Sequence, residues 1–234
     1  MEKFSILTTP VRFDKSDYLS LLSLSVGTAI SRQKKMGELV IGENGWNVDV
    51  KNRRIKFGEN EFDCGIIGSE SYQSNTWLWG WANTESGIPE ICFAPSRRAK
   101  RNLPECEEFQ AEKFMLDEVH NGHNLSMITV CASEKNVCYY RCPYDGGALF
   151  VQIEGLPESV FAPISLDDLA REFLEIIRSF YCDHKLLAAG FLHQNCYSFE
   201  DGGDFISAAD GGRNLRFDFE EIDGIFRVVN ISLQ

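Results

Sequence analysis

Residues 46–83, WNVDVKNRRIKFGENEFDCGIIGSESYQSNTWLWGWAN, decide the fold class of this chain. Apolar and polar residues alternate over Trp46–Val50 and again over Arg54–Phe57, as in strands with one buried face. A turn at Gly58–Asn60 leads into Phe62–Ile67, and a polar connection then leads into Thr76–Asn83. Strands joined by short turns pair antiparallel, so we predict an antiparallel meander with one solvated face.

Helical patterns flank this meander. Apolar residues recur at helical spacing over Tyr18–Met36, with Ser16 or Asp17 as the N-cap and Gly37 as the stop. A further helix is predicted over His123–Ser133.

The last part of the chain combines a hairpin, two helices and more strands. Ser165 precedes Asp168 by three residues, in the manner of a capping box, and Asp183 can cap a second helix that begins at His184. The predicted strands are 137–140, 148–153, 197–200, 205–209, 215–219 and 226–233.

This order of elements predicts an α+β fold with mainly antiparallel sheets and amphipathic helices packed on one face. Strands follow strands, and they do not alternate singly with helices as in a doubly wound parallel fold. A helix followed by a meander occurs at both ends of the chain. Pro157–Pro163 is a predicted linker between an N-terminal region, 1–156, and a C-terminal region, 164–234, and the two regions could also form one continuous domain.

Charge and composition restrict the classes of partner. The 234 residues include 35 Asp and Glu against 23 Lys and Arg, a formal net charge of −12. Such a chain repels phosphate and anionic lipid, so we expect no general binding of nucleic acids and no membrane association. The sequence shows neither a signal peptide pattern nor an apolar run of 18 residues, which favours a cytoplasmic protein.

The eight cysteines are interpreted as free thiols in a reducing cytoplasm, because no C-x-x-C pair occurs. His120 and His123 flank Gly122 and lack further ligands of metal-site spacing, so no metal is expected. The G-x-S-x-G, G-x-G-x-x-G and G-x(4)-G-K-[ST] patterns are absent, and no cofactor is expected. The basic run Arg97–Arg101 is interpreted as a solvated loop or short helix.

The tryptophan-rich segment is the first candidate binding site. In a strand, Trp77, Trp79 and Trp81 would share one face, and with Asn83 they could bind a sugar, a nucleobase or another planar ligand. The alternative is that the indoles fill the core.

A second candidate site lies in the predicted hairpin. Arg141 is flanked by Tyr140 and Tyr144, and the planar guanidinium fork can hold a carboxylate or a phosphate. The alternative is an ordinary hairpin with an exposed arginine.

The tryptophan segment also resembles the signature of an uncharacterised bacterial family, a domain of unknown function with G-S-x-S followed by W-L-W-x-W-A-N. Here the segment reads Gly68-Ser69-Glu70-Ser71 and then Thr76-Trp77-Leu78-Trp79-Gly80-Trp81-Ala82-Asn83. The resemblance spans most of the chain and implies no established activity. Further positions that match are Trp46, Tyr139–Arg141, Pro143–Gly147, Asp183–Gly190, Asp210–Gly211 and Arg216–Asp218.

Three functions remain open from the sequence. The first is a non-catalytic protein that binds another protein, for example as an inhibitor or immunity-type protein, because residues 196–234 carry eight acidic and three basic side chains. The second is a small-ligand binder that uses the tryptophan face. The third is an enzyme with dispersed catalytic residues, among which the histidines His120, His123, His184 and His193 are candidates.

Overall fold

The computed structural model describes residues 5–234 and divides into two compact units. The first unit contains the described residues up to Ser31 together with Ala162–Gln234, and the second contains Arg32–Phe161. The boundary at Phe161 falls inside the predicted linker Pro157–Pro163. The other boundary falls within the helix α1, Tyr18–Met36, whose first part clusters with the C-terminal segment.

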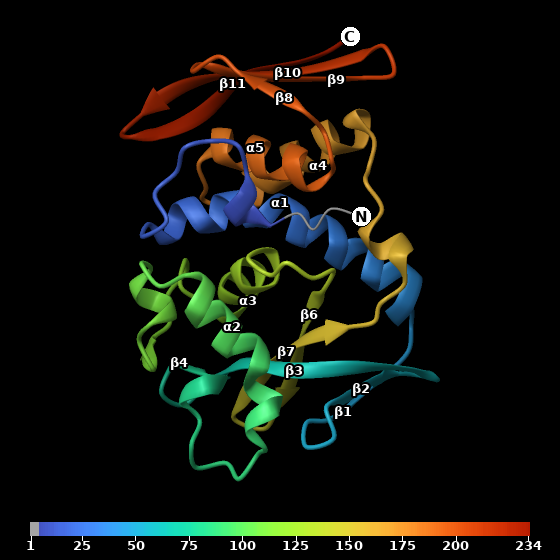
Figure 1. The fold of residues 1–234 in the computed structure, drawn as a ribbon, viewed down its shortest axis with the longest axis vertical. Helices are drawn as coiled ribbons and strands as arrows, with labels where there is room; N and C mark the ends of the chain where they lie inside the picture. The colour runs from blue at the N-terminus through green and yellow to red at the C-terminus, as the bar shows by residue number, and fades with distance from the viewer. Residues whose placement is uncertain (1–4) are drawn as a thin grey trace. The chain divides into compact units, whose positions relative to one another are not determined.

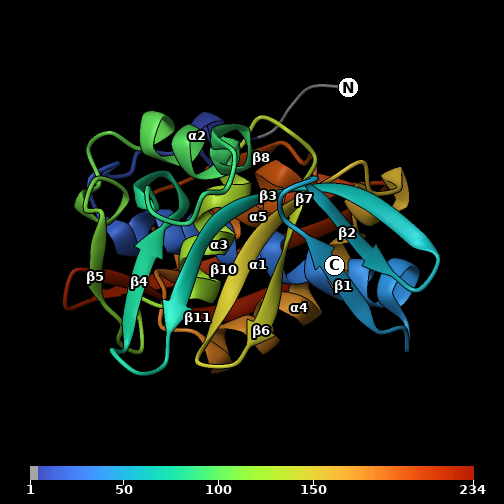
Figure 2. The same cartoon turned by 90° about the horizontal axis from the view of Figure 1, so that it is seen from below.

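The second unit is built on a seven-stranded antiparallel sheet (Figure 2). β3 is its centre: β7 pairs with one edge of β3, and β2 and then β4 pair with the other edge. β1 continues the sheet from β2, β5 from β4 and β6 from β7. The strands are β1 (Trp46–Asp49), β2 (Arg54–Phe57), β3 (Asn60–Ser71), β4 (Thr76–Trp79), β5 (Lys113–Met115), β6 (Cys138–Tyr144) and β7 (Gly147–Glu154).

Two helices of this unit pack on the sheet. α2 (Ala94–Asn102) approaches β3 closely, because Gly65 has no Cβ that would collide with Pro95. α3 (Gly122–Cys131) is capped by Asn121, whose side chain accepts from the amide of Asn124. The opposite face of the sheet packs on the end of α1 and the segment that follows β7, through side chains that include Met36, Val40, Ile55, Phe57, Cys64, Val151, Ile153 and Val160.

The first unit is an antiparallel sheet covered on one face by helices (Figure 1). Its strands follow the order β11-β10-β9-β8, and the helices α4 and α5 pack on it. Phe173 of α4 contacts Phe217 of β10 with ring centroids 4.5 Å apart. The elements are α4 (Leu166–Ser179), α5 (His184–Gln194), β8 (Phe199–Asp201), β9 (Phe205–Asp210), β10 (Arg213–Ile222) and β11 (Ile225–Leu233).

The structure confirms the predicted α+β fold with antiparallel sheets. The predicted bounds of α1 are correct, and Ser165 and Asp183 cap α4 and α5 as expected. Gly37 does not stop the chain's helical path, because a π-helical turn continues to Ile41 and ends at Gly42 with φ of 55°. In residues 84–108 the basic run forms the larger part of α2.

Two sequence-based strand limits need correction. β3 was expected to end at Ile67 but extends to Ser71, because β7 pairs with it as far as Ser71 and Gly147. β4 ends at Trp79, and Trp81 lies in a 3₁₀ turn, Gly80–Ala82.

No helix within residues 5–234 is both long and apolar enough to cross a membrane.

Candidate functional site

Trp77 and Trp79 lie in the core of the second unit. Both are fully buried, with ring centroids 5.3 Å apart in an edge-to-face arrangement. Trp77 also packs on Phe150, and a Cβ at Gly68 would lie 2.2 Å from its ring, so the ring requires a glycine there. These two indoles therefore present no surface to a ligand and fill the space between the sheet and its neighbours.

Trp81 and Asn83 lie beyond the end of β4. Trp81 is half-buried, and Lys100 Nζ lies 3.3 Å from the centroid of its ring, the geometry of a cation–π contact. Asn83 follows the 3₁₀ turn and is half-buried. The turn at Gly80 separates Trp81 from the two buried indoles, so the three rings do not share a strand face.

The three hairpin candidates also separate. Tyr140 packs on Phe57, with ring centroids 4.9 Å apart, on the face of the sheet that contacts α1. Tyr144 is exposed near the turn. Arg141 lies on the opposite face from Tyr140, because neighbouring strand residues alternate.

Arg141 belongs to a cluster of polar side chains around Glu70, which we call the Glu70 cluster: Glu70, Tyr72, His123, Tyr139 and Arg141. Arg141 donates to the Tyr72 hydroxyl, and its Nε lies 3.8 Å from a Glu70 carboxylate oxygen. The other Glu70 oxygen accepts from the amide of Gly122 at 2.9 Å. Only 12% of the Glu70 side chain is exposed, so these contacts compensate for much of its lost hydration.

Glycine is needed around Glu70. A Cβ at Gly122 would lie 2.7 Å from the Glu70 carboxylate and 2.5 Å from the Phe150 ring. A Cβ at Gly147 would lie 2.2 Å from the Glu70 carbonyl oxygen. The first turn of α3 is therefore held against β3 at a distance that only glycine permits.

His123 completes the cluster from the first turn of α3. Its Nδ1 lies 3.1 Å from the Tyr139 hydroxyl, and its ring packs edge-to-face on Phe150. Burial lowers the pKa of His123, the Glu70 carboxylate opposes this shift and Arg141 adds to it. His123 is therefore neutral near pH 7 and can donate or accept one proton at each ring nitrogen according to its tautomer.

A hollow of about 390 Å³ opens beside Glu70 and Tyr72. It is lined by Glu70, Ser71, Tyr72, Asn75, Leu116, Asp117, Glu118 and Asn121. The Asp117 carboxylate accepts from the amides of Val119 and His120, and these bonds and the His120 ring outweigh the effect of partial burial, so its pKa is lowered. The ionisable side chains that line the hollow thus include three carboxylates, of Glu70, Asp117 and Glu118, and no cation.

The sequence did not indicate Glu70 as a site residue. It stands in the G-S-E-S motif, but β3 was predicted to end before it. The only local signal was that strand alternation, continued beyond Ile67, places Gly68 and Glu70 on the sheet face that Trp77 and Trp79 occupy.

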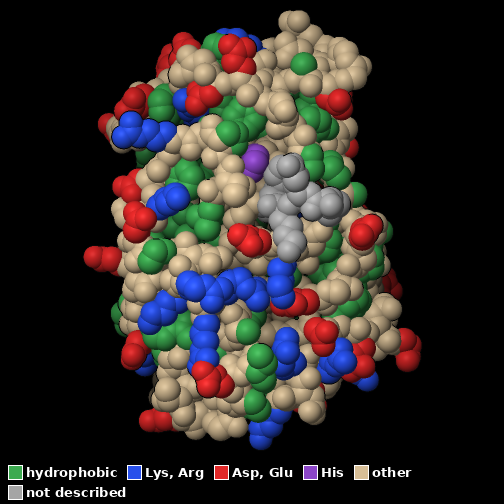
Figure 3. All heavy atoms as spheres, in the orientation of Figure 1, with side chains coloured by type: hydrophobic (Ala, Val, Ile, Leu, Met, Phe, Trp, Pro, Cys, Tyr) green, Lys and Arg blue, Asp and Glu red, His purple; other side chains and the backbone are tan. Residues whose placement is uncertain are grey.

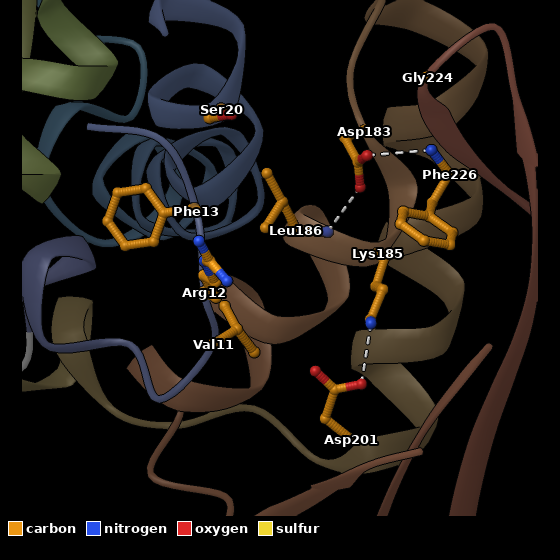
Figure 4. Close-up of a pocket in the computed structure, with 10 residues that line it drawn as sticks. All are labelled: Val11, Arg12, Phe13, Ser20, Asp183, Lys185, Leu186, Asp201, Gly224 and Phe226. Carbon is orange, nitrogen blue, oxygen red and sulfur yellow. Dashed lines mark hydrogen bonds and ion pairs between the residues drawn. The ribbon is translucent and has the colours of Figure 1, made fainter. Parts of the chain in front are cut away.

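The first unit contains a smaller pocket of about 200 Å³ (Figure 4). The Lys185 ammonium contacts the Asp201 carboxylate and the carbonyl of Gly203, both at 2.8 Å. The Asp183 carboxylate accepts from the amides of Leu186 and Phe226. Lys185, Asp183 and Asp201 thus already have partners within the unit, and Arg12 adds a guanidinium to the lining of the pocket.

No group of three or more metal-ligating side chains occurs among residues 5–234. The histidines have partners inside the protein. His120 lies between Asp117 and Glu108, at 2.9 and 3.3 Å, and His193 lies 3.1 Å from the Thr8 hydroxyl. His184 accepts the amide of Val228 at Nδ1.

One edge of the C-terminal sheet is half covered. The amides of Phe226 and Val228 in β11 point away from β10 and donate to Asp183 and His184. Beyond a bulge opposite Asp218 and Phe219 the other half of the strand begins, and Gln234 there exchanges two hydrogen bonds with Asn214.

The outward backbone groups of this second half are open. Alternation in an antiparallel ladder turns the amides of Ile231 and Leu233 away from β10, and neither has a partner within the described part of the chain. Val229 and Leu233 are exposed apolar side chains on this stretch, 55% and 36% exposed. We call Val229–Leu233 the open edge.

Acidic side chains lie at the end of β10 that faces the first half of β11. Glu220 and Glu221 pair with Arg227 and Phe226 across the ladder, and Asp223 lies in the turn. All three are exposed, and none forms an ion pair within residues 5–234. Docking of a basic segment here would be favoured electrostatically.

Fold and sites together define a two-unit α+β protein without a recognisable metal centre in its described residues. The chain belongs to a family of unknown function (DUF6882), whose model matches residues 19–156. This match covers the whole sheet of the second unit and the Glu70 cluster. No curated protein and no solved structure matches the chain.

Proposed function

We propose that the protein is a non-catalytic binding protein whose partner is another protein that adds a strand to β11. The open edge supports this proposal most directly, because a partner strand can pair with its unoccupied amides and carbonyls. Exposed strand edges are normally covered or protected by charge, and here neither occurs over Val229–Leu233.

The acidic end of β10 supports a basic partner. Basic side chains that flank a strand on the open edge could meet Glu220, Glu221 and Asp223 beyond the bulge, where α5 ends the strand pairing. Such rim charges mainly raise the association rate and weaken with salt. An inhibitor of a basic protein is the concrete form of this proposal.

The test is affinity co-purification from the native lysate, read by mass spectrometry for proteins and small molecules. Val229→Lys places a charge on the open edge, where lysine discourages strand addition. Leu39→Lys is the matched control, since Leu39 is also 55% exposed but lies outside this sheet. The proposal requires a stoichiometric protein partner that Val229→Lys loses and Leu39→Lys retains. Retention of the partner by both variants contradicts it.

The enzyme and tryptophan-face alternatives have less support. Of the three indoles, only Trp81 has exposed surface, and Lys100 already occupies one face of its ring. The four histidines lie in four different environments, so they do not converge on one site.

A further inference from the structure

A band of basic side chains covers the outward side of α2 (Figure 3). The helix carries four cations and no acidic residue, in a chain whose net charge is −12. Its buried side consists of Pro95, Ser96 and Ala99, so Arg97 and Arg101 are exposed while Arg98 and Lys100 are half-buried. We call this set, with two residues of the β1–β2 loop described next, the α2 ridge: Lys51, Arg53, Arg97, Arg98, Lys100 and Arg101.

The β1–β2 loop lies against the segment that enters α2. Cys92 Sγ contacts the Lys51 carbonyl at 3.9 Å, and Val50 packs on Cys92 and Phe93. The amide of Cys64, next to the Gly65 on which Pro95 packs, donates to the Arg53 carbonyl at 2.9 Å. The β1–β2 loop, which carries Lys51 and Arg53, therefore adjoins the segment that leads into α2.

Some of these cations have explanations that need no ligand. Arg97 pairs with Glu90, and Lys100 packs on Trp81. Lys100 and Arg101 lie in the last turn of α2, where the helix dipole favours cations.

Arg53 and Arg98 are different. Arg53 Nε and Arg98 Nη1 are buried donors with no hydrogen-bond partner among the described residues. Buried donors are almost always hydrogen-bonded in native proteins, and an exception calls for a water or an ion. A guanidinium gains most from an anionic acceptor, because charge-assisted hydrogen bonds are about twice as strong as neutral ones.

We propose that the α2 ridge binds the phosphate group of a small phosphorylated molecule. Phosphate offers several acceptor oxygens to donors from two chain segments, and arginine forks match its geometry. This site is independent of the open edge of β11 and goes beyond the proposed protein-binding function.

A long polyanion fits the surroundings less well. Gln110 donates to the Lys100 carbonyl at 3.0 Å, so the acidic turn with Glu107 and Glu108 follows directly at the end of α2. A small ligand stays within the range of the ridge, since charges are screened over about 8 Å at physiological salt. A polymer would extend over these carboxylates.

The test is calorimetric titration of the full chain with inorganic phosphate and with pyrophosphate, in sodium chloride of constant ionic strength. Binding of phosphate alone would indicate a single oxyanion site, and tighter binding of pyrophosphate would indicate a diphosphate group. A single-stranded 15-nucleotide DNA is titrated in parallel.

Arg98→Gln and Arg53→Gln should each raise the dissociation constant about tenfold or more, because each removes a charged donor. Arg54→Gln is the control, since Arg54 is next in sequence to Arg53 but pairs with Asp63 at 2.7 Å. It should stay within about twofold of the wild type. Arg98→Lys keeps the charge and loses the fork, so it should also bind more weakly and covers the case in which a glutamine variant fails to fold.

Three results would overturn the proposal. They are no binding of phosphate or pyrophosphate above the chloride control, an equal loss in Arg54→Gln, and binding of the oligonucleotide only.

Discussion

Each unit attaches a helix to an antiparallel sheet through one carboxylate and one histidine. In the second unit the carboxylate is on the sheet, and in the first unit it is on the helix. In the second unit the carboxylate of Glu70 is on the sheet and accepts the first amide of α3. In the first unit the carboxylate of Asp183 caps α5 and accepts the backbone amide of Phe226 in β11. A histidine in the first turn then makes the second contact, His123 to the Tyr139 hydroxyl and His184 to the amide of Val228.

The difference lies in what the sheet contributes. The second unit uses side chains on a sheet face, so its strand ladder is untouched. The first unit uses the amides of an edge strand, so α5 covers that edge as far as the two side chains reach and leaves the rest open. In the first unit the contacts of Asp183 and His184 with β11 therefore both attach α5 to the sheet and cover half of its edge.

Close-packed glycines should give the largest effects in both units. A Cβ at Gly68 would lie 2.2 Å from the Trp77 ring, and one at Gly190 would lie 2.3 Å from the Leu24 carbonyl oxygen. We expect Gly68→Ala and Gly190→Ala each to lower the free energy of unfolding by about 3 kcal/mol. Gly45→Ala, with nothing within 4 Å, is the control and should change little.

Urea unfolding separates the two cases. All four tryptophans, Trp46 and the three of the W-L-W-G-W segment, lie in the second unit, so fluorescence reports on that unit alone while circular dichroism reports on both. Gly68→Ala should shift the fluorescence transition. An unchanged fluorescence midpoint would contradict the close contact with Trp77.

Replacing the carboxylate by alanine should lower the free energy of unfolding more at Asp183, in the first unit, than at Glu70, in the second. Asp183→Ala loses a helix cap and leaves the Phe226 amide without its acceptor, about 2–4 kcal/mol together. Glu70→Ala leaves the Gly122 amide without its acceptor but keeps the helix cap, which Asn121 provides, so it should cost about 1–2 kcal/mol. The ratio of the two values, measured by urea unfolding, tests the comparison. Equal costs would show that the edge contact of Asp183 contributes little.

The histidines predict a pH dependence. Burial lowers the pKa of His184, and the nearby Arg227 lowers it further, while Asp183 partly opposes the shift. Burial also lowers the pKa of His123. Each is neutral when folded, while the unfolded chain takes up a proton below about pH 6.5. The contribution of these two histidines to stability is therefore constant above pH 6.5 and falls as the pH drops from 6.5 through their lowered pKa values.

Asparagine variants isolate this effect, because the asparagine Oδ1 can replace Nδ1 as acceptor without titrating. We expect the slope of unfolding free energy against pH, between about 4.5 and 6.5, to be smaller in His184→Asn and His123→Asn. Asp117 and Asp201, whose lowered pKa values act below this window, serve as internal reference. A wild-type slope in both variants would contradict the prediction.

The smallest expected effect is on the quenching of tryptophan fluorescence by acrylamide. Trp77 and Trp79 are fully buried, so acrylamide should hardly quench a Trp46→Phe, Trp81→Phe variant, and its emission should be blue-shifted. The wild type should be quenched somewhat more, through its two half-buried indoles. Strong quenching of the double variant would restore the tryptophan-face hypothesis.

Local patterns predicted what local forces determine. Ser165, Asp183 and the apolar spacing of Tyr18–Met36 act within a few residues, and the structure confirms all three. The antiparallel class followed from the same kind of evidence.

The candidate site depended on contacts between distant segments. Glu70 is placed by pairing of β3 with β7, and its partner Gly122 is 52 residues away. Trp81 leaves the strand because the chain turns at Gly80, where Phe93 and Ser96 would lie 3.0 Å from a Cβ. Neither packing contact leaves a periodic trace in the sequence, so an alternating pattern alone could not separate Trp81 from the buried pair.

The division of α1 between the units has a consequence for synthesis on the ribosome. The second unit is complete once residue 161 has emerged, whereas the first unit cannot close until its strands after residue 197 have been made. During that interval the first part of α1 lacks the α5 side chains that cover Leu24 and Gly27 in the finished protein. The growing chain therefore exposes an apolar helix face ahead of a finished unit until α5 has been made.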